Sequence, residues 1–117
     1  MSAPGRMLGL DVGERRIGVA VSEGRIAVPL TIIDHINRAR DIERVAEIAE
    51  REGAQTIVVG LPLAPDGGEG EQARLTRRFG EQLAERVPVP IAYQDERLTT
   101  TGVAGQRARG QPIADLA

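Results

Sequence analysis

Residues 7–30 read MLGLDVGERRIGVAVSEGRIAVPL, and this stretch decides the fold. It begins with a short apolar run that ends in an acid, Asp11. Apolar side chains then alternate with small ones across residues 17–22, and the alternation returns across residues 26–30. A period of two is typical of strands, and the connections between these segments are short and contain glycine. The stretch therefore predicts a three-stranded antiparallel meander.

The period of the apolar residues changes after residue 38. Over residues 39–51 the spacing becomes that of an amphipathic helix, with apolar side chains at Ile42, Val45, Ala46 and Ala49. Gly53 follows and is well placed to end this helix. Residues 56–59 form a β-branched run, which is typical of a strand buried on both faces of a parallel sheet.

A second helix and a fifth strand complete the pattern. Residues 71–86 carry one apolar face and predict a helix, and residues 89–93, which lie among prolines, predict a short strand. Residues 61–70 before this helix are rich in glycine and proline, so we expect a long mobile loop. A last helix is expected to begin near Thr100 or Thr101 as its N-cap.

The predicted order of elements, β-β-β-α-β-α-β-α, indicates an α/β fold. Right-handed crossovers make the first, fourth and fifth strands parallel. We therefore expect a mixed five-stranded sheet with the spatial order 3-2-1-4-5 and helices on both faces. The chain has 117 residues, of which 41% are apolar, and this length suits one domain.

Candidate functional residues gather at one edge of this sheet, because sites form beyond the carboxyl ends of parallel strands. Asp11, the loop after Gly60, and the acids Asp95 and Glu96 all fall there. Asp11 and Glu96 start two strand spacings apart, roughly 10 Å, and the longer Glu96 side chain can lean inward. Asp95 points the other way if the strand alternation continues. We therefore expect Asp11 and Glu96, rather than Asp95, to bind metal.

The residue inventory narrows the chemistry of this edge. The chain has no cysteine and one histidine, His35, which we interpret as an ordinary surface or turn residue. Carboxylate oxygens then remain as ligands, and they favour Mg²⁺ or Mn²⁺. All fifteen basic residues are arginine, which excludes a P-loop lysine and a Schiff-base lysine. Arginine suits phosphate binding, but a GC-rich genome also produces this pattern, and we favour the genomic reading.

The sequence contains no membrane-targeting feature. No window approaches the ~18 apolar residues of a membrane span, and the opening residues, MSAPGRM, lack the apolar core of a signal peptide. Together with the absence of cysteine, this favours a cytoplasmic protein without a membrane partner. The net charge is −2, so bulk charge alone does not indicate nucleic-acid binding.

Three motifs resemble the signatures of the YqgF/RuvX family. They are LGLDVGERRIGVAVSE at residues 8–23, IVVGLPLAPDGGEG at residues 57–70 and YQDERLTT at residues 93–100. Their order and spacing are similar to those of the family. The resemblance implies a single RNase H-like nuclease domain over residues 1–117 and a role in pre-16S rRNA processing during ribosome biogenesis. It also implies a divalent metal held by the acids at Asp11 and Glu96.

The resemblance weakens toward the end of the sequence. Family members carry a third acid after the DER motif, at the start of a final helix. Asp115 is the only acid after Glu96, so the resemblance makes Asp115 the candidate third ligand. No segment long enough for a helix follows it before Ala117, and we expect the family's C-terminal helix to be missing or truncated here.

The reaction that these expectations describe is metal-assisted phosphodiester hydrolysis. In it, three acids would hold Mg²⁺ or Mn²⁺ and three arginines would contact substrate phosphates. The acids are Asp11, Glu96 and Asp115, and the arginines are Arg15, Arg16 and Arg97. We interpret the arginines of the second helix, Arg74, Arg77 and Arg78, as solvated residues.

Other functions stay open on the sequence alone. One is a Holliday junction resolvase-like nuclease that cleaves branched DNA, and another is a noncatalytic nucleic-acid-binding module with the same fold. Sugar kinases and actin-like ATPases also open with a similar strand-turn-strand, but a kinase needs a second domain, for which 117 residues leave no room. Neither the choice of RNA over DNA nor the oligomeric state follows from the sequence.

Overall fold

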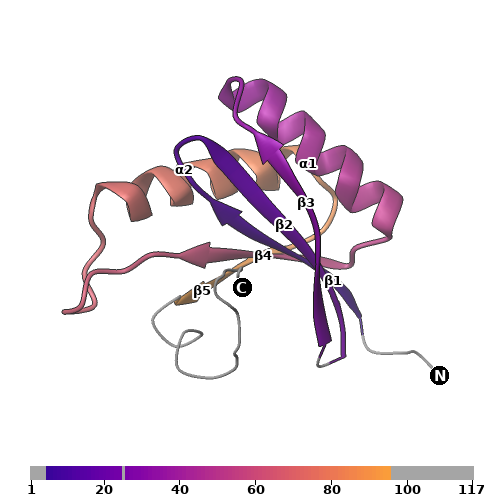
Figure 1. Cartoon of the computed structure of the whole chain (residues 1–117), viewed down its shortest axis with the longest axis horizontal. Coiled ribbons are helices and arrows are strands. Elements are labelled where there is room, and N and C mark those ends of the chain that lie inside the picture. The colour runs from indigo at the N-terminus through magenta and orange to yellow at the C-terminus, as the bar shows by residue number, and fades with distance from the viewer. Residues whose placement is uncertain (1–4, 25, 96–117) are drawn as a thin grey trace.

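A computed structural model describes residues 5–24 and 26–95 of the chain (Figure 1). Strands and helices follow one another in the predicted order. They are β1 (Arg6–Val12), β2 (Arg16–Glu23), β3 (Ile26–Asp34), α1 (Arg38–Glu52), β4 (Thr56–Leu61), α2 (Glu71–Arg86) and β5 (Ile91–Asp95).

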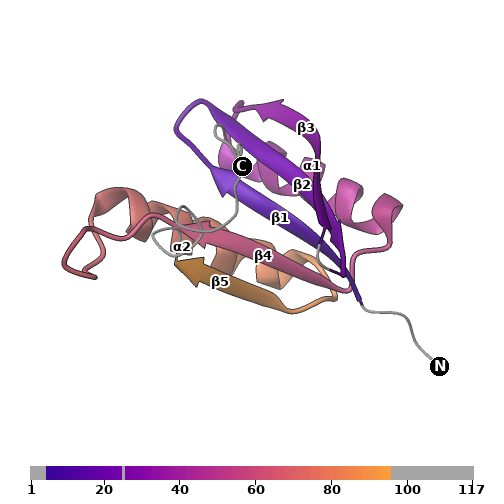
Figure 2. The same ribbon diagram turned by 60° about the horizontal axis from the view of Figure 1, so that its bottom comes forward.

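The strands form one mixed sheet of five strands with the order β3-β2-β1-β4-β5 (Figure 2), which confirms the predicted topology. β1, β2 and β3 pair as an antiparallel meander. β4 lies parallel to β1, and β5 lies parallel to β4. The carboxyl ends of β1, β4 and β5 therefore point toward the same edge, as the site prediction requires.

α1 and α2 cover the same face of the sheet and pack against each other (Figures 1 and 2). We predicted helices on both faces, and the last predicted helix, from Thr100 or Thr101, falls outside the described residues. Residues 96–117 lie outside the described part of the chain. Within the described part, the second face carries no helix. This matters for the site, because Asp11 belongs to that second face.

The core lies between the helices and one face of the sheet. It is almost wholly aliphatic, because the chain has one phenylalanine and no tryptophan. Its fully buried members include Leu8, Ile57 and Val59 from the sheet and Val45 and Leu83 from the helices. Burying one such side chain contributes about 1.5–3 kcal/mol, so the contact between helices and sheet is a main source of stability.

The strands extend beyond their predicted bounds or are shifted from them, and β3 and β5 have identifiable reasons. β3 runs to Asp34 because its pairing with β2 continues past a bulge, where Leu30 has no partner between Pro29 and Thr31. β5 begins at Ile91 and not at residue 89. Pro90 has no backbone N–H, so it enters the ladder only as an acceptor, from Ile57 N at 3.0 Å.

Local signals fix the limits of α1. The Asn37 side chain accepts a hydrogen bond from Arg40 N at 2.9 Å, which caps the first turn. Gly53 ends the helix with φ of 67°, a left-handed conformation that glycine adopts without a Cβ clash. The predicted stop at Gly53 is therefore confirmed.

Candidate functional site

At the carboxyl ends of the parallel strands, β1 separates from β4, whereas β4 stays paired with β5. Pairing between β1 and β4 stops at Leu10 and Val59. β4 nevertheless continues beside β5 as far as the pair Leu61 and Asp95. Beyond Leu10 the end of β1 therefore diverges from β4, as Figure 2 shows. We call the space between these strand ends the β1–β4 gap.

Asp11 lies on the β1 side of this gap. Its neighbours Leu10 and Val12 face the core, so Asp11 points to the face that α1 and α2 leave open. The side chain is exposed, and it has no hydrogen bond or ion pair within the described residues. A carboxylate held by a paired strand and left without a protein partner can accept a cation at little cost.

Small residues surround Asp11 on the open face. Gly18 is directly opposite Asp11 on β2, and Gly9 is opposite Ala20. A Cβ placed on Gly9 would meet one backbone oxygen of Ala20 at 3.9 Å and nothing nearer, so packing in the described part does not require glycine there. Gly9 and Gly18 therefore add no side chain beside Asp11 on the open face.

Asp95 lies on the other side of the gap but belongs to the opposite face. It is in register with Leu61, whose side chain is buried under the helices. Adjacent strands place residues in register on the same face of a sheet. Asp95 and Asp11 thus point to opposite faces, and the interpretation that Asp95 is not the partner of Asp11 is consistent with this arrangement.

Three predicted site residues, Glu96, Arg97 and Asp115, lie outside the described residues. Within residues 5–24 and 26–95, no three Asp, Glu or His side chains are grouped closely enough to hold a metal ion. The described part of the chain therefore contributes one candidate ligand, Asp11.

Arg15 lies in the turn that follows β1, and Arg16 begins β2. Gly13 N donates to Arg16 O at 2.9 Å and closes the turn, and His35 N donates to Arg15 O at 2.8 Å. Both guanidinium groups are exposed, and neither has an ion pair within the described residues. The turn is thus a fixed main-chain frame that presents two unpaired positive charges just beyond Asp11.

His35 is better anchored than the sequence suggested. Its Nδ1 lies 2.5 Å from Oδ2 of Asp41, which is only 2% exposed. The other oxygen of Asp41 accepts a hydrogen bond from Ile36 N at 3.1 Å. This buried carboxylate thus fixes the connection between β3 and α1. His35 in turn donates its main-chain N–H to Arg15 O, so the same connection supports the turn that carries Arg15. An aspartate in the first turn of a helix, shortly after an Asn cap, is the sequence signal that could have indicated this role.

The glycine-rich loop after β4 is an ordered turn and extends from the sheet at the same end as the gap (Figure 1). Ala64 N donates to Gly68 O and Gly67 N donates to Ala64 O, each at 2.8 Å. The Asp66 carboxylate also accepts from Gly68 N at 2.8 Å. Gly67 has φ of 89°, which other residues rarely adopt. Three hydrogen bonds inside the loop define its conformation, and the expected mobility of this connection stays a prediction.

α2 joins this loop to β5 through Arg77. The Arg77 guanidinium forms an ion pair with Glu69 at 2.7 Å and lies 4.9 Å from the centre of the Tyr93 ring. Hydrogen bonding to Arg77 lowers the pKa of Glu69, and burial raises the pKa of Tyr93. The sequence suggested that Arg77 is a solvated residue, but these contacts give it a structural role.

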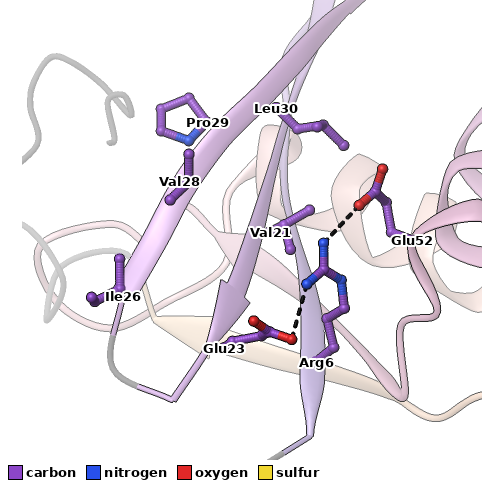
Figure 3. Close-up of a pocket in the computed structure, with 8 residues that line it drawn as sticks. All are labelled: Arg6, Val21, Glu23, Ile26, Val28, Pro29, Leu30 and Glu52. Carbon is purple, nitrogen blue, oxygen red and sulfur yellow. Dashed lines mark hydrogen bonds and ion pairs between the residues drawn. The ribbon is translucent and has the colours of Figure 1, made fainter.

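A separate hollow lies far from the gap, at the amino end of β1 (Figure 3). Apolar side chains of β3 line it, and Arg6 lies at its base between Glu23 and Glu52. Arg6 contacts Glu52 at 2.8 Å and Glu23 at 3.0 Å, and both carboxylates raise its pKa. This hollow contains no candidate catalytic residue, so it is not part of the site at the gap.

Sequence comparison identifies the proteins that this chain is similar to. The profile of the RuvX family, described as a Holliday junction resolvase, matches residues 5–113. A Cereibacter sphaeroides protein named "Putative pre-16S rRNA nuclease" is 45% identical over 106 residues, which cover 89% of this chain and 65% of that protein. A protein of the same name from Anaeromyxobacter is 39% identical in an alignment that covers 96% of this chain and 90% of that protein.

Structural comparison supports the fold. Thermus thermophilus RuvC in complex with a Holliday junction substrate matches with a TM-score of 0.64 at 17% identity, over 86% of this chain and 70% of that chain. Archaeoglobus fulgidus Pelota matches with a TM-score of 0.54 at 15% identity, over 80% of this chain and 28% of that chain. At these identities the likeness concerns the fold alone, and the RuvC match confirms the predicted RNase H-like architecture.

Proposed function

The chain belongs to the RuvX family, and we propose that it is a metal-dependent endonuclease that processes pre-16S ribosomal RNA. The observation that carries this proposal is the position of Asp11 at the carboxyl end of the central strand of an RNase H-like sheet. Its carboxylate is exposed and has no partner among the described residues. The names of the relatives supply the substrate, and the chain covers 65% of the Cereibacter sphaeroides relative's length.

The acids proposed as metal ligands are Asp11, Glu96 and Asp115. The donor set fits Mg²⁺ or Mn²⁺, because carboxylate oxygens are available and the chain has no thiolate. A bound divalent ion would supply Lewis acidity for phosphodiester hydrolysis. A viral terminase nuclease domain of the same fold, solved with manganese, has a TM-score of 0.51 at 13% identity over 81% of this chain and 39% of that chain.

The register of β5 supports Glu96 as the second ligand. Asp95 shares the helix-covered face with Leu61, and successive side chains of an extended strand alternate between faces. Glu96 lies outside the described residues, but it follows Asp95 directly in the sequence, so this alternation favours it over Asp95 as the partner of Asp11. Asp115 is proposed as the third ligand on the family resemblance.

The chain's own positive charges would hold the substrate. Arg15 in the turn beyond Asp11 and Arg16 at the start of β2 are exposed, and neither has an ion pair among the described residues. Arg97 follows Glu96 directly in the sequence. Guanidinium groups bind phosphate through two parallel hydrogen bonds. Gly9 and Gly18 carry no side chain that would hinder a nucleic-acid backbone from approaching Asp11.

We also propose that residues 1–117 act as one nuclease domain in the cytoplasm. No helix within the described residues is long and apolar enough to cross a membrane. Branched DNA is the second candidate substrate, favoured by the RuvX family description and by the Holliday junction in the matching RuvC structure.

A substrate comparison tests the proposal. The wild-type chain is incubated with a pre-16S rRNA fragment and with a four-way DNA junction, each with Mn²⁺, Mg²⁺ or EDTA. We expect metal-dependent cleavage of the RNA and little cleavage of the junction. Cleavage of the junction alone would instead identify a resolvase, and binding without cleavage of either would identify a noncatalytic module.

Calorimetry tests the metal site without relying on activity. Asp11→Asn removes a charge with almost no change in shape, so it should weaken Mn²⁺ binding by roughly tenfold or more while the fold persists. Glu85→Gln, at an exposed acid near the end of α2, is the matched control. Equal Mn²⁺ affinity of the Asp11→Asn and wild-type proteins would exclude Asp11 as a ligand.

A further inference from the structure

The width of the β1–β4 gap is not set by main-chain pairing. Where two strands pair, their hydrogen bonds hold them about 4.8 Å apart. That restraint ends at Leu10 and Val59, so Asp11 and Val12 are paired with β2 alone. Other contacts must therefore fix the position of the Asp11 segment relative to β4 and β5.

A side chain of α2 makes such a contact. Gln72 Nε2 donates to Val12 O at 3.1 Å, across 60 residues of sequence. The same nitrogen lies 3.4 Å from Oγ1 of Thr76, which is fully buried. Val12 directly follows Asp11, so this bond ties the Asp11 side of the gap to the first turns of α2.

The same helix also holds the other side of the gap. Tyr93 Oη donates to Arg77 O at 3.4 Å, and the Arg77 guanidinium lies over the Tyr93 ring. Tyr93 is two residues before Asp95, at the end of β5. Gln72 and Arg77 are five residues apart on one rigid helix, or about 7.5 Å along its axis. α2 thus spans the gap and contacts both sides.

We propose that Gln72 is a positioning residue for catalysis, which sets the separation between Asp11 and the carboxyl end of β5. This inference rests on the proposed function, because it assigns a role within the same site. Gln72 acts through Val12 and does not itself touch substrate. Its amide is suited to the task because the Val12 carbonyl requires a donor and Gln supplies one.

The substitution Gln72→Glu tests the donor with little change in shape, since it replaces the amide by two acceptor oxygens. Gln82→Glu is the matched control, because it makes the same chemical change at an exposed position of the same helix. Gln72→Lys restores a donor, and Gln82→Lys controls for its added charge.

We expect Gln72→Glu to lower kcat for RNA cleavage by roughly tenfold to a hundredfold and to leave KM within about twofold, because small displacements of catalytic groups carry such penalties. Gln72→Lys should recover most of the loss, and both Gln82 variants should behave as wild type. An unchanged kcat in Gln72→Glu, a change confined to KM, or failure of Gln72→Lys to recover activity would overturn the proposal.

A second measurement separates this inference from the nuclease assignment. The ¹³C chemical shift of the Val12 carbonyl reports its hydrogen bond whether or not the protein cleaves RNA. Gln72→Glu should shift this resonance and Gln82→Glu should not. If wild type cleaves no substrate, the proposed function fails, and an unchanged Val12 resonance in Gln72→Glu would independently refute the role of Gln72.

Discussion

Gly80→Ala should destabilise the protein, although alanine is the better helix former. Gly80 lies inside α2, where replacement by alanine ordinarily stabilises by about 1 kcal/mol. Here the added Cβ would lie 2.9 Å from Cζ and 3.0 Å from Cε1 of Tyr93, and closer still to the hydroxyl oxygen. Real Cβ contacts are almost never so short, so the Tyr93 ring would have to move.

The cost of that movement follows from the contacts of Tyr93. Forcing extra volume into a packed site costs about 1–3 kcal/mol. A displaced ring also leaves Arg77, whose cation–π contact contributes about 0.5–1 kcal/mol at a partly exposed site. Against the gain in helix propensity, the net destabilisation should be about 0.5–3 kcal/mol.

Urea unfolding followed by circular dichroism measures this change. Tyr93→Leu provides the matched background, because a flexible side chain can give way to the new methyl group. In that background Gly80→Ala should stabilise by about 1 kcal/mol, so the sign of the effect reverses. Stabilisation by Gly80→Ala in the wild-type background would show that Tyr93 does not occupy the space beside Gly80.

Three further predictions concern the surroundings of the site. Asp41→Ala should lower the free energy of unfolding in urea by about 2–3 kcal/mol, because it leaves Ile36 N and His35 without their buried acceptor. A decrease below about 0.5 kcal/mol would contradict this role. Hydrogen bonding to Arg77 lowers the pKa of Glu69 below its usual value near 4.5, so the pair stabilises the fold above that pH, and this contribution is lost as the pH falls through the lowered pKa. Glu69→Gln should therefore make Tm fall less steeply in acid. A Tm profile equal to that of wild type would count against the pair. Arg15→Gln and Arg16→Gln should each reduce the salt dependence of RNA binding by about one phosphate contact, measured by titration at several salt concentrations, and an unchanged slope would exclude that arginine as a phosphate ligand.

The arrangement of the sheet was predictable because it depends on local periodicity. Alternation over residues 17–30 indicated the meander, and the change of period after residue 38 indicated the crossovers that make β4 and β5 parallel. The limits of α1 also depend on local residue types. Asn37 caps the first turn of the helix, and Gly53 ends the helix in a left-handed conformation. The strand ends were less predictable, because the bulge in β3 arises from pairing with β2.

The candidate site was predictable in its location and less so in its supports. Asp11 could be identified from the sequence because it directly follows a short apolar run that predicts a strand. Gln72 could not be found in this way, since its partner Val12 is 60 residues away and the bond depends on how α2 packs. The His35–Asp41 contact joins residues only six apart, but burial of Asp41 became evident only in the folded protein.

Single-turnover cleavage of a pre-16S rRNA fragment by wild type and Asp11→Asn tests the central claim most directly. The claim is that the exposed carboxylate beside the β1–β4 gap supports a metal-dependent nuclease. It predicts cleavage by wild type with Mn²⁺ or Mg²⁺, none with EDTA, and a rate lower by roughly 10²-fold or more in Asp11→Asn. Glu85→Gln should cleave as wild type does. Cleavage by Asp11→Asn at the wild-type rate would contradict the claim.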